Sequence, residues 1–236
     1  MCDVDKQGGP GAVEARGELR LRLESAGVKA SPESIEALVR LARFRSVAPG
    51  EQVYVQGEPA LLTLILSGYA ISQRTTEDGR RFMFAIGGAG LLFGYSAVSG
   101  VASSVEILAL TAGEVAQWSG RDVRPLLERD PALAMTAVDS HSASLHLAIG
   151  EIERFLHQDA RGRVVRILDR YRDLFFGESP ILNRGHLTGL VGTTREMTGR
   201  VLRQLEREGT LARVGRSGLV LLRPEGLTGM AQRPST

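Results

Sequence analysis

Several residue types are scarce in this chain of 236 residues, and each shortage excludes a class of protein. The single cysteine, Cys2, cannot form a disulfide within the chain and cannot supply the roughly four thiolates that hold an iron–sulfur cluster. No apolar run approaches the roughly 20 residues that a helix needs to span a bilayer. The N-terminus lacks the basic and apolar segments of a secretory signal. These absences predict a cytoplasmic protein that contacts no membrane.

Histidine is also scarce, and its placement does not suit a metal enzyme built on strands. The four histidines, all outside the region of predicted strands, are His141, His146, His157 and His186. The sequence contains no phosphate-binding glycine loop and no pairing of a nucleophile with a base. We therefore predict that the chain is not an enzyme and holds no metal ion.

Charge is unevenly distributed, although the formal net charge is only +2. Residues 159–236 contain 14 arginines and 8 acidic residues, whereas the rest of the chain contains 15 basic and 19 acidic residues. A basic C-terminal third on an acidic body indicates that the C-terminal part binds nucleic acid.

Residues 193–206 are the most informative stretch, because they predict one short helix with two unlike faces. The apolar face carries Met197, Val201, Leu202 and Leu205 at helical spacing. The opposite face carries Arg195, Glu196, Gly199, Arg200, Arg203 and Arg207. Glu196 follows Thr193 by three residues, which fits a capping box, and Gly209 is expected to end the helix.

The segments on either side of this helix predict a winged helix-turn-helix. Asn183 is placed to cap a shorter helix over residues 184–191, which Gly192 would end. Residues 210–214 and 218–222 predict two strands around a Gly-Arg-Ser-Gly turn. The pattern is typical of proteins whose second helix enters the major groove of DNA. The alternative interpretation of the charged face is an ordinary solvated helix surface.

Residues 187–206, which contain Arg-Glu-x-x-x-Arg from Arg195 to Arg200, resemble the recognition region of the cyclic AMP receptor protein/FNR family of bacterial transcription regulators. The resemblance implies a homodimer that reads a palindrome of TGTGA-like half-sites in double-stranded DNA and works with RNA polymerase. It places Arg195 and Arg200 on guanines and Glu196 on a cytosine. Further DNA-contacting candidates, mainly for phosphates, are Thr194, Arg184, Arg203, Arg213 and Arg216.

Residues 44–118 contain short apolar segments separated by turn residues, which indicates a β-sandwich or barrel. Expected strands are 53–55, 62–66, 69–72, 81–86, 104–110 and 114–118. Glu77-Asp78-Gly79 predicts a hairpin between the third and fourth of them. Two helices, over 18–26 and 32–43, precede the strands, and residues 1–14 are expected to be disordered. Together with the resemblance, this predicts an α+β protein whose N-terminal domain is a double-stranded β-helix, the jelly-roll of cyclic-nucleotide-binding domains.

The residues with which this family binds cyclic AMP are absent. The family's Phe-Gly-Glu corresponds here to Phe93, Gly94 and Tyr95, and its Arg-Ser pair corresponds to Ser103 and Ser104. The Thr-Ser pair that contacts adenine corresponds to Ala148 and Ile149. Because a buried phosphate without a cation is costly, we expect a degenerate pocket, no cofactor and no gating by cyclic AMP in the usual mode. The effector, if one exists, has another chemistry.

Residues 131–157 predict a long helix that begins at Asp130-Pro131. Alternating spacings of four and three give a heptad seam over Ala134, Val138, His141, Leu145, Ala148, Ile152 and Phe155. The resemblance makes this seam the dimer interface, although a core helix of the same domain has a similar pattern. Asp159 is expected to cap the next helix after a joint at residues 158–159.

The resulting domain prediction is a sensor domain over 15–130, a dimerisation helix over 131–157 and a winged helix-turn-helix over 158–226. The predicted function is sequence-specific transcription regulation. The alternative function is a ligand-responsive regulatory module that acts mainly through protein contacts.

Overall fold

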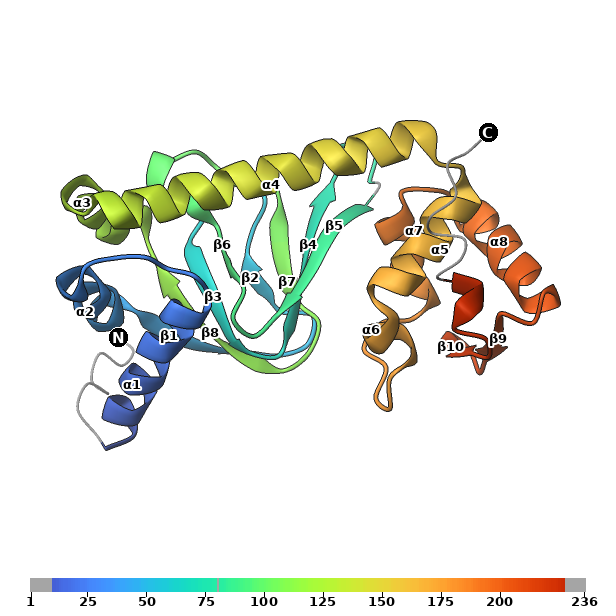
Figure 1. The fold of residues 1–236 in the computed structure, drawn as a ribbon, viewed down its shortest axis with the longest axis horizontal. Helices are drawn as coiled ribbons and strands as arrows, with labels where there is room; N and C mark the ends of the chain where they lie inside the picture. The colour runs from blue at the N-terminus through green and yellow to red at the C-terminus, as the bar shows by residue number, and fades with distance from the viewer. Residues whose placement is uncertain (1–9, 80, 228–236) are drawn as a thin grey trace. The chain divides into compact units, whose positions relative to one another are not determined.

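The computed structural model describes residues 10–79 and 81–227 (Figure 1). Its helices are α1 (Pro10–Ser25), α2 (Pro32–Leu41), the 3-10 helix η1 (Tyr95–Ser99), α3 (Gly120–Arg129), α4 (Pro131–His157), α5 (Ala160–Arg170), α6 (Arg172–Phe176), α7 (Arg184–Val191) and α8 (Arg195–Arg207). Its strands are β1 (Arg43–Val47), β2 (Gln52–Tyr54), β3 (Leu62–Ser67), β4 (Tyr69–Thr75), β5 (Arg81–Gly88), β6 (Leu92–Phe93), β7 (Glu106–Ala109), β8 (Gly113–Trp118), β9 (Leu211–Val214) and β10 (Gly218–Leu221). The predicted α+β fold class is confirmed.

The chain divides into two compact units, one formed by Met1–Ser72 with Ile86–Ser144 and the other by Gln73–Ala85 with Leu145–Thr236. Eight strands form two four-stranded sheets, in the orders β1-β8-β3-β6 and β2-β7-β4-β5. In the first sheet, Ala116 of β8 lies opposite both Phe44 and Leu64, because β1 and β3 flank β8 in antiparallel register. The strand order interleaves segments from the two ends of the strand region, so the fold depends on contacts between residues distant in sequence.

The alternation of side chains along the strands separates two apolar cores. Ile65 and Val115 point into a core with residues of β2, β4 and β7, which fills the space between the sheets. Their neighbours Leu64 and Ala116 point to the opposite side, where α1, α2, α3 and the start of α4 cover the first sheet. A one-residue shift of β3 or β8 would exchange these two sets of side chains, so burial fixes the register.

Polar groups connect the covering helices of this unit. The indole Nε1 of Trp118 donates to the carbonyl of Leu38 at 2.7 Å, which joins β8 to α2. Asp130, which is 6% exposed, accepts from the backbone N–H of Ser31 at 2.7 Å and caps α4 by accepting from Leu133 at 3.2 Å. The predicted start of the long helix at Asp130-Pro131 is therefore confirmed.

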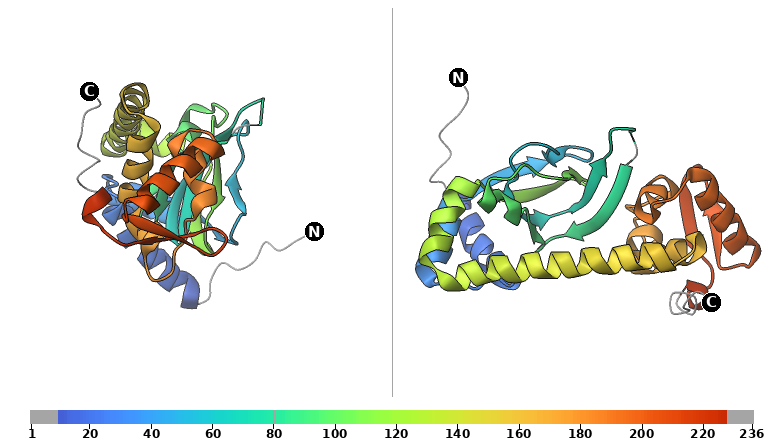
Figure 2. Two further views of the ribbon diagram at one scale, coloured as in Figure 1. Left: turned by 90° about the vertical axis from the view of Figure 1, so that its right-hand side faces the viewer. Right: turned by 90° about the horizontal axis from the view of Figure 1, so that it is seen from above.

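The C-terminal part of the second unit is a bundle of short helices followed by a hairpin. The α5 side chains Val164, Val165 and Leu168 are fully buried, and α5 contacts both α7 and α8. Strands β9 and β10 pair antiparallel, with Leu211 opposite Leu221. Figure 2 shows this hairpin beside the helices that the sequence predicts as a helix-turn-helix.

Several local predictions were wrong. Residues 10–14 begin α1 rather than being disordered, while residues 1–9, including Cys2, lie outside the described part of the chain. The sequence did not predict β1, β6 or α3, whose patterns are too short or too polar. The sequence also predicts a short strand at residues 180–182, but these residues form a loop, because the N–H groups of Ile181 and Leu182 both donate to the Leu174 carbonyl rather than to a strand.

Helix α4 is unbroken over 27 residues, as the right-hand view of Figure 2 shows. Helix α4 is long enough to cross a bilayer but not apolar enough, and no other helix in the described ranges is both long and apolar enough.

Candidate nucleic-acid interface and ligand pocket

The two short helices α7 and α8 begin and end at the residues that the sequence marks. Asn183 Oδ1 accepts from the N–H of Gly185 at 2.8 Å at the start of α7. Gly192 ends α7 in the left-handed region with φ of +66°, which favours glycine and turns the chain toward α8. Thr194 Oγ1 accepts from the N–H of Met197 at 3.1 Å and so caps α8. The predicted helix-turn-helix is confirmed.

The capping box expected between Thr193 and Glu196 is wrong. The capping residue is Thr194, one position later, so Glu196 is not used as a cap. Its carboxylate instead lies 3.3 Å from Nη2 of Arg200, and their side chains remain 81% and 65% exposed, respectively. A pair this exposed contributes only a few tenths of a kcal/mol, so both groups stay available to other partners.

The two faces of α8 differ as the sequence predicts. Its buried residues are Thr198, Val201, Leu202 and Leu205. The charged side chains Arg195, Glu196, Arg200 and Arg203 are exposed on the other face. The hydroxyl of Thr198 is satisfied within the helix, because it donates to the carbonyl of Thr194 at 3.0 Å. With Arg207, which is also exposed, this face of one short helix presents four guanidiniums and the Glu196 carboxylate.

The two arginines of the wing, Arg213 and Arg216, differ in their partners. Arg213 Nε donates to Oε2 of Glu206 at 2.9 Å, and its backbone N–H donates to Oε1 at 3.4 Å. The Arg213 side chain holds the pKa of Glu206 below its usual range, chiefly through this hydrogen bond. The sequence analysis missed the partner Glu206, so Arg213 is less available for DNA phosphates than expected. Helical spacing within α8 cannot reveal a contact between a residue of α8 and a residue of the following strand.

Arg184 binds the wing through the backbone. Its N–H donates to the carbonyl of Ser217 at 3.0 Å, and its guanidinium donates to the carbonyl of Arg216. The guanidinium of Arg216 is exposed at the tip of the wing. Arg184 thus fixes the wing against the start of α7, while the Arg216 side chain has no hydrogen bond or ion pair within residues 10–79 and 81–227.

The joint between α4 and α5 carries a charged network that the sequence did not reveal. Asp159 Oδ1 caps α5 by accepting from Gly162 at 2.7 Å, as predicted. Glu151 of α4 binds both Arg166 at 2.5 Å and Arg170 at 2.9 Å of α5. These contacts attach the last two turns of α4 to the helices of the same unit.

The residues expected at the ligand pocket separate into different surroundings. Phe93 packs on Tyr54, with ring centroids 5.9 Å apart, inside the core between the sheets. Ser103 is buried, hydrogen-bonds Tyr54 and donates to the carbonyl of Val105 at 2.6 Å. Burial raises the pKa of Tyr54. The position that the sequence resemblance matched to a phosphate-binding arginine therefore belongs to a neutral, internally satisfied group.

The other residues expected at the pocket do not lie beside Phe93 and Ser103. Gly94 has φ of +84°, and a Cβ there would lie 2.1 Å from the Leu61 carbonyl oxygen, so only glycine fits. Ser104 is exposed, and Ala148 and Ile149 are exposed on α4 in the other unit. Tyr95 packs against the core on the helix-covered side of the first sheet, not between the sheets, and its hydroxyl interacts with Ser140.

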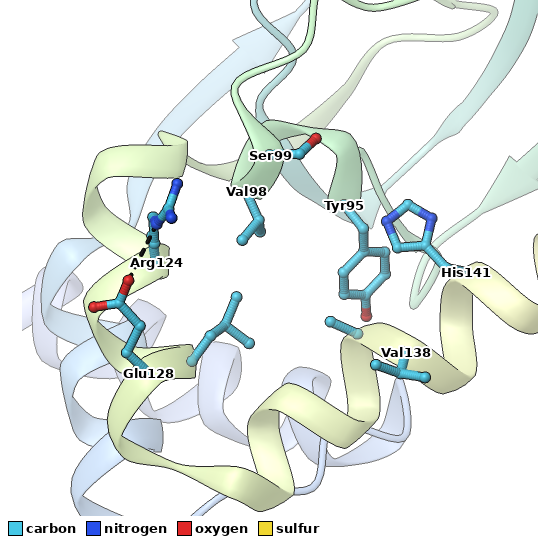
Figure 3. A pocket seen from close by; sticks show the side chains of 9 residues that line it. Tyr95, Val98, Ser99, Arg124, Glu128, Val138 and His141 are labelled. Carbon is cyan, nitrogen blue, oxygen red and sulfur yellow. Dashed lines mark hydrogen bonds and ion pairs between the residues drawn. The ribbon is translucent and has the colours of Figure 1, made fainter.

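Tyr95 instead borders a pocket of about 400 Å³ between η1, α3 and the first half of α4. Its lining comprises Tyr95, Val98, Ser99, Arg124, Leu127, Glu128, Ala137, Val138 and His141. Figure 3 shows Arg124 and Glu128 on one side of the opening and Tyr95 and His141 on the other. The rings of Tyr95 and His141 are 5.9 Å apart, and Arg124 is paired with Glu128 at 3.1 Å. The lining therefore combines apolar side chains with an arginine–glutamate pair.

The predicted seam of α4 is open to solvent within this single chain. Exposed members of the seam are Val138, His141, Leu145, Ala148, Ile152 and Phe155. Apolar side chains such as Leu145 and Ile152 are more than 60% exposed. Such a row of exposed apolar residues marks an interaction surface.

Within residues 10–79 and 81–227, no three histidine, cysteine, aspartate or glutamate side chains gather as metal ligands would.

Comparisons with known families match two separate segments of the chain. The cyclic nucleotide-binding domain family matches residues 44–130. The Crp-like helix-turn-helix domain family matches residues 162–230. The cyclic AMP receptor protein of Thermus thermophilus is 29% identical over 185 residues, which cover 77% of this chain and 85% of that protein.

Two solved structures show the same fold at lower identity. FixK2 from Bradyrhizobium japonicum has a TM-score of 0.68 and 22% identity, covering 82% of this chain and 99% of its own. A transcriptional regulator of the CRP/FNR family from Eubacterium rectale has a TM-score of 0.76 and 15% identity, covering 86% and 95%.

Proposed function

Because this chain belongs to the CRP/FNR family of DNA-binding transcription regulators, which are not enzymes, we propose that it acts as a homodimer on palindromes with TGTGA-like half-sites. The observation that carries the proposal is the exposed face of α8. It combines Arg195, Glu196 and Arg200 on a helix whose other face is fixed in a core. The charge pattern alone would not support base reading, because the side chains also need the rigid helix that this core provides.

The chemistry of these side chains matches base edges in the major groove. An arginine guanidinium donates two parallel hydrogen bonds to N7 and O6 of guanine, and a carboxylate accepts from the amino group of cytosine. We assign Arg195 and Arg200 to guanines and Glu196 to a cytosine. Arg203, the α8 cap at Thr194, Arg184 and Arg216 are assigned to supporting contacts, chiefly with phosphates.

The dimer is supported by the exposed heptad seam of α4. Burying Leu145, Ile152 and their neighbours against a second copy would remove a row of apolar side chains from water. A two-fold dimer would place the two recognition helices about 34 Å apart, one turn of DNA, on successive major grooves. Such a dimer would act on DNA in the cytoplasm together with RNA polymerase.

Independence from cyclic AMP is supported by the composition of the β-domain interior. Ser103 and Tyr95 stand where cyclic-AMP-binding relatives have a phosphate arginine and a ribose carboxylate, and the Ser103 hydroxyl is already hydrogen-bonded. An anion placed there would lack a cationic partner. We therefore propose that any effector differs from cyclic AMP, even though the Thermus thermophilus relative is named for that nucleotide.

Fluorescence anisotropy with a labelled TGTGA palindrome tests these assignments. The purified protein is titrated with and without cyclic AMP, and a scrambled duplex is the control. We expect specific binding that the nucleotide does not change. Binding only with cyclic AMP would refute the interpretation of the pocket, while equal binding to both duplexes would refute the half-site assignment. Loss of all salt-dependent DNA binding would favour a module that acts through proteins.

A further inference from the structure

Gly199 is an unusual residue for the middle of α8. The helix runs from Arg195 to Arg207, and Gly199 occupies its second turn. A glycine inside a helix costs about 1 kcal/mol relative to alanine, because the unfolded chain is more flexible and no side chain covers the backbone. This cost implies that either the packing of the fold or an external partner requires glycine at this position.

The fold itself does not require glycine at this position. The backbone is not in the left-handed region, and a Cβ built there would approach, among the described residues, only Nη1 of Arg203 at 3.6 Å. That is an ordinary van der Waals distance to the end of a flexible side chain. In contrast, a Cβ on Gly120 of α3 would lie 1.9 Å from the carbonyl oxygen of Ala97, so that glycine is required by packing.

Gly199 lies within the charged face, on the side of Arg195. Arg195 precedes it by one helical turn and Arg203 follows it by one turn, while Glu196 and Arg200 flank it. Its neighbour Thr198 is buried and points about 100° away around the helix axis, while Gly199 itself is half-buried. The only gap in this face of long side chains is therefore surrounded by the side chains assigned to DNA.

The dimensions of DNA give this gap a purpose. An α-helix with its side chains is about 10–12 Å wide, and the major groove is about 12 Å wide and 8.5 Å deep, so the helix fits with little clearance. A missing side chain on this face lets the backbone move closer to the base edges by roughly one carbon–carbon bond length, about 1.5 Å. A shorter approach lets the flanking arginines reach the bases in unstrained geometry.

We propose that Gly199 is the point at which α8 comes closest to the floor of the major groove, and that it thereby determines how well the flanking side chains read the bases. This inference rests on the proposed function of the α8 face. Gly199 supplies clearance rather than a hydrogen bond. Its effect should therefore depend on the volume of the side chain placed there, not on its charge.

A substitution series separates this role from a structural one. Gly199→Ala, Gly199→Ser and Gly199→Leu are compared for thermal unfolding and for affinity to the preferred palindrome. We expect Gly199→Ala to raise the melting temperature and yet weaken DNA binding about tenfold, with a larger loss for Gly199→Leu. The slope of log affinity against log salt should stay unchanged, because no phosphate-binding cation is removed.

Gly17→Ala is the matched control. Gly17 lies in α1, and a Cβ there meets nothing within 4 Å among the described residues, so alanine should stabilise the helix without affecting DNA binding. Arg200→Ala separates the clearance proposal for Gly199 from the assignment of the α8 face to DNA. Normal binding by all Gly199 variants with weakened binding by Arg200→Ala would overturn the clearance proposal alone. Normal binding by Arg200→Ala as well would overturn the assignment of the α8 face.

Discussion

The guanidinium of Arg163 lies over the ring of Phe155, with its central carbon 4.7 Å from the ring centroid. The same side chain donates to the carbonyl of Gln158 at 2.6 Å and to the carbonyl of Val191 at 3.3 Å. One residue of α5 therefore braces the end of α4, the joint that follows it and the last residue of α7. The joint expected at residues 158–159 is held by side chains on both sides.

Arg163→Ala should loosen this joint. It removes two hydrogen bonds to backbone carbonyls and a cation–π contact, so hydrogen exchange at amides 158–163 should rise and DNA affinity should fall. Dimerisation should persist, because the seam is retained. Arg170→Ala is the control, since Arg166 still binds Glu151 in that variant. Exchange rates that match the parent protein would show that Arg163 does not brace the joint.

Arg200→Ala should weaken binding to the preferred palindrome by about 1–3 kcal/mol and relax the preference at one base pair of each half-site. Stability should change by less than about 0.5 kcal/mol, because the only ion pair lost is the exposed one with Glu196. Anisotropy with a set of single-base variants measures both effects. Arg207→Ala, at the far end of α8, serves as control. An unchanged base preference would contradict the role of Arg200.

The wing offers a matched pair of arginines. Arg216→Ala should reduce the slope of log affinity against log salt by about 1, as expected when one phosphate contact is lost. Arg213→Ala should change that slope less, because its guanidinium is engaged by Glu206 at 2.7 Å. Titrations at several salt concentrations compare the two variants. Equal slopes for both variants would mean that Arg213 exchanges Glu206 for a phosphate on binding.

Two leucines of α4 test the dimer seam. Leu145 and Leu147 are 63% and 56% exposed, and only Leu145 belongs to the heptad seam. Leu145→Asp should place two like charges in the interface and convert the dimer to monomers in sedimentation velocity. Leu147→Asp should remain dimeric. Dissociation by Leu147→Asp alone would place the interface on another face of α4.

Asp130 should make the N-terminal unit sensitive to acid. Hydrogen bonds from the Ser34 hydroxyl and the Ser31 N–H hold its pKa well below the usual range. A lowered folded-state pKa means that the ionised carboxylate stabilises the fold above the unfolded pKa of roughly 3.9, and that this contribution is lost as pH falls through the folded value.

Asp130→Asn should therefore lower the melting temperature at pH 7 and lose less stability than the parent protein between about pH 4 and pH 2. Circular dichroism across this range provides the measurement. Asp139→Asn, on an exposed residue of α4, is the control. Parallel pH profiles for the parent and Asp130→Asn would argue against the carboxylate as the acid-sensitive group.

Elements with strong local signals were predicted well. Helix α7 was predicted over its observed range because Asn183 and Gly192 mark its ends chemically. The cap of α8 was misplaced by one residue because Thr193 and Thr194 are chemically equivalent in sequence, and only the backbone path selects Thr194. Strand β6 has two residues and no periodicity of its own, and its pairing with β3 defines it.

The sequence by itself determined which side chains α8 can offer, since helical period and the caps place Arg195, Glu196 and Arg200 on the face opposite the core. It also predicts that the residues with which the family holds cyclic AMP are missing. Only the tertiary structure decided that Arg213 is engaged by Glu206, that Phe93 and Tyr95 enter different surroundings, and that the space at Gly199 is not filled by the fold. Periodicity fixes the direction of a side chain from its own element, whereas its partner depends on which distant segment packs beside it.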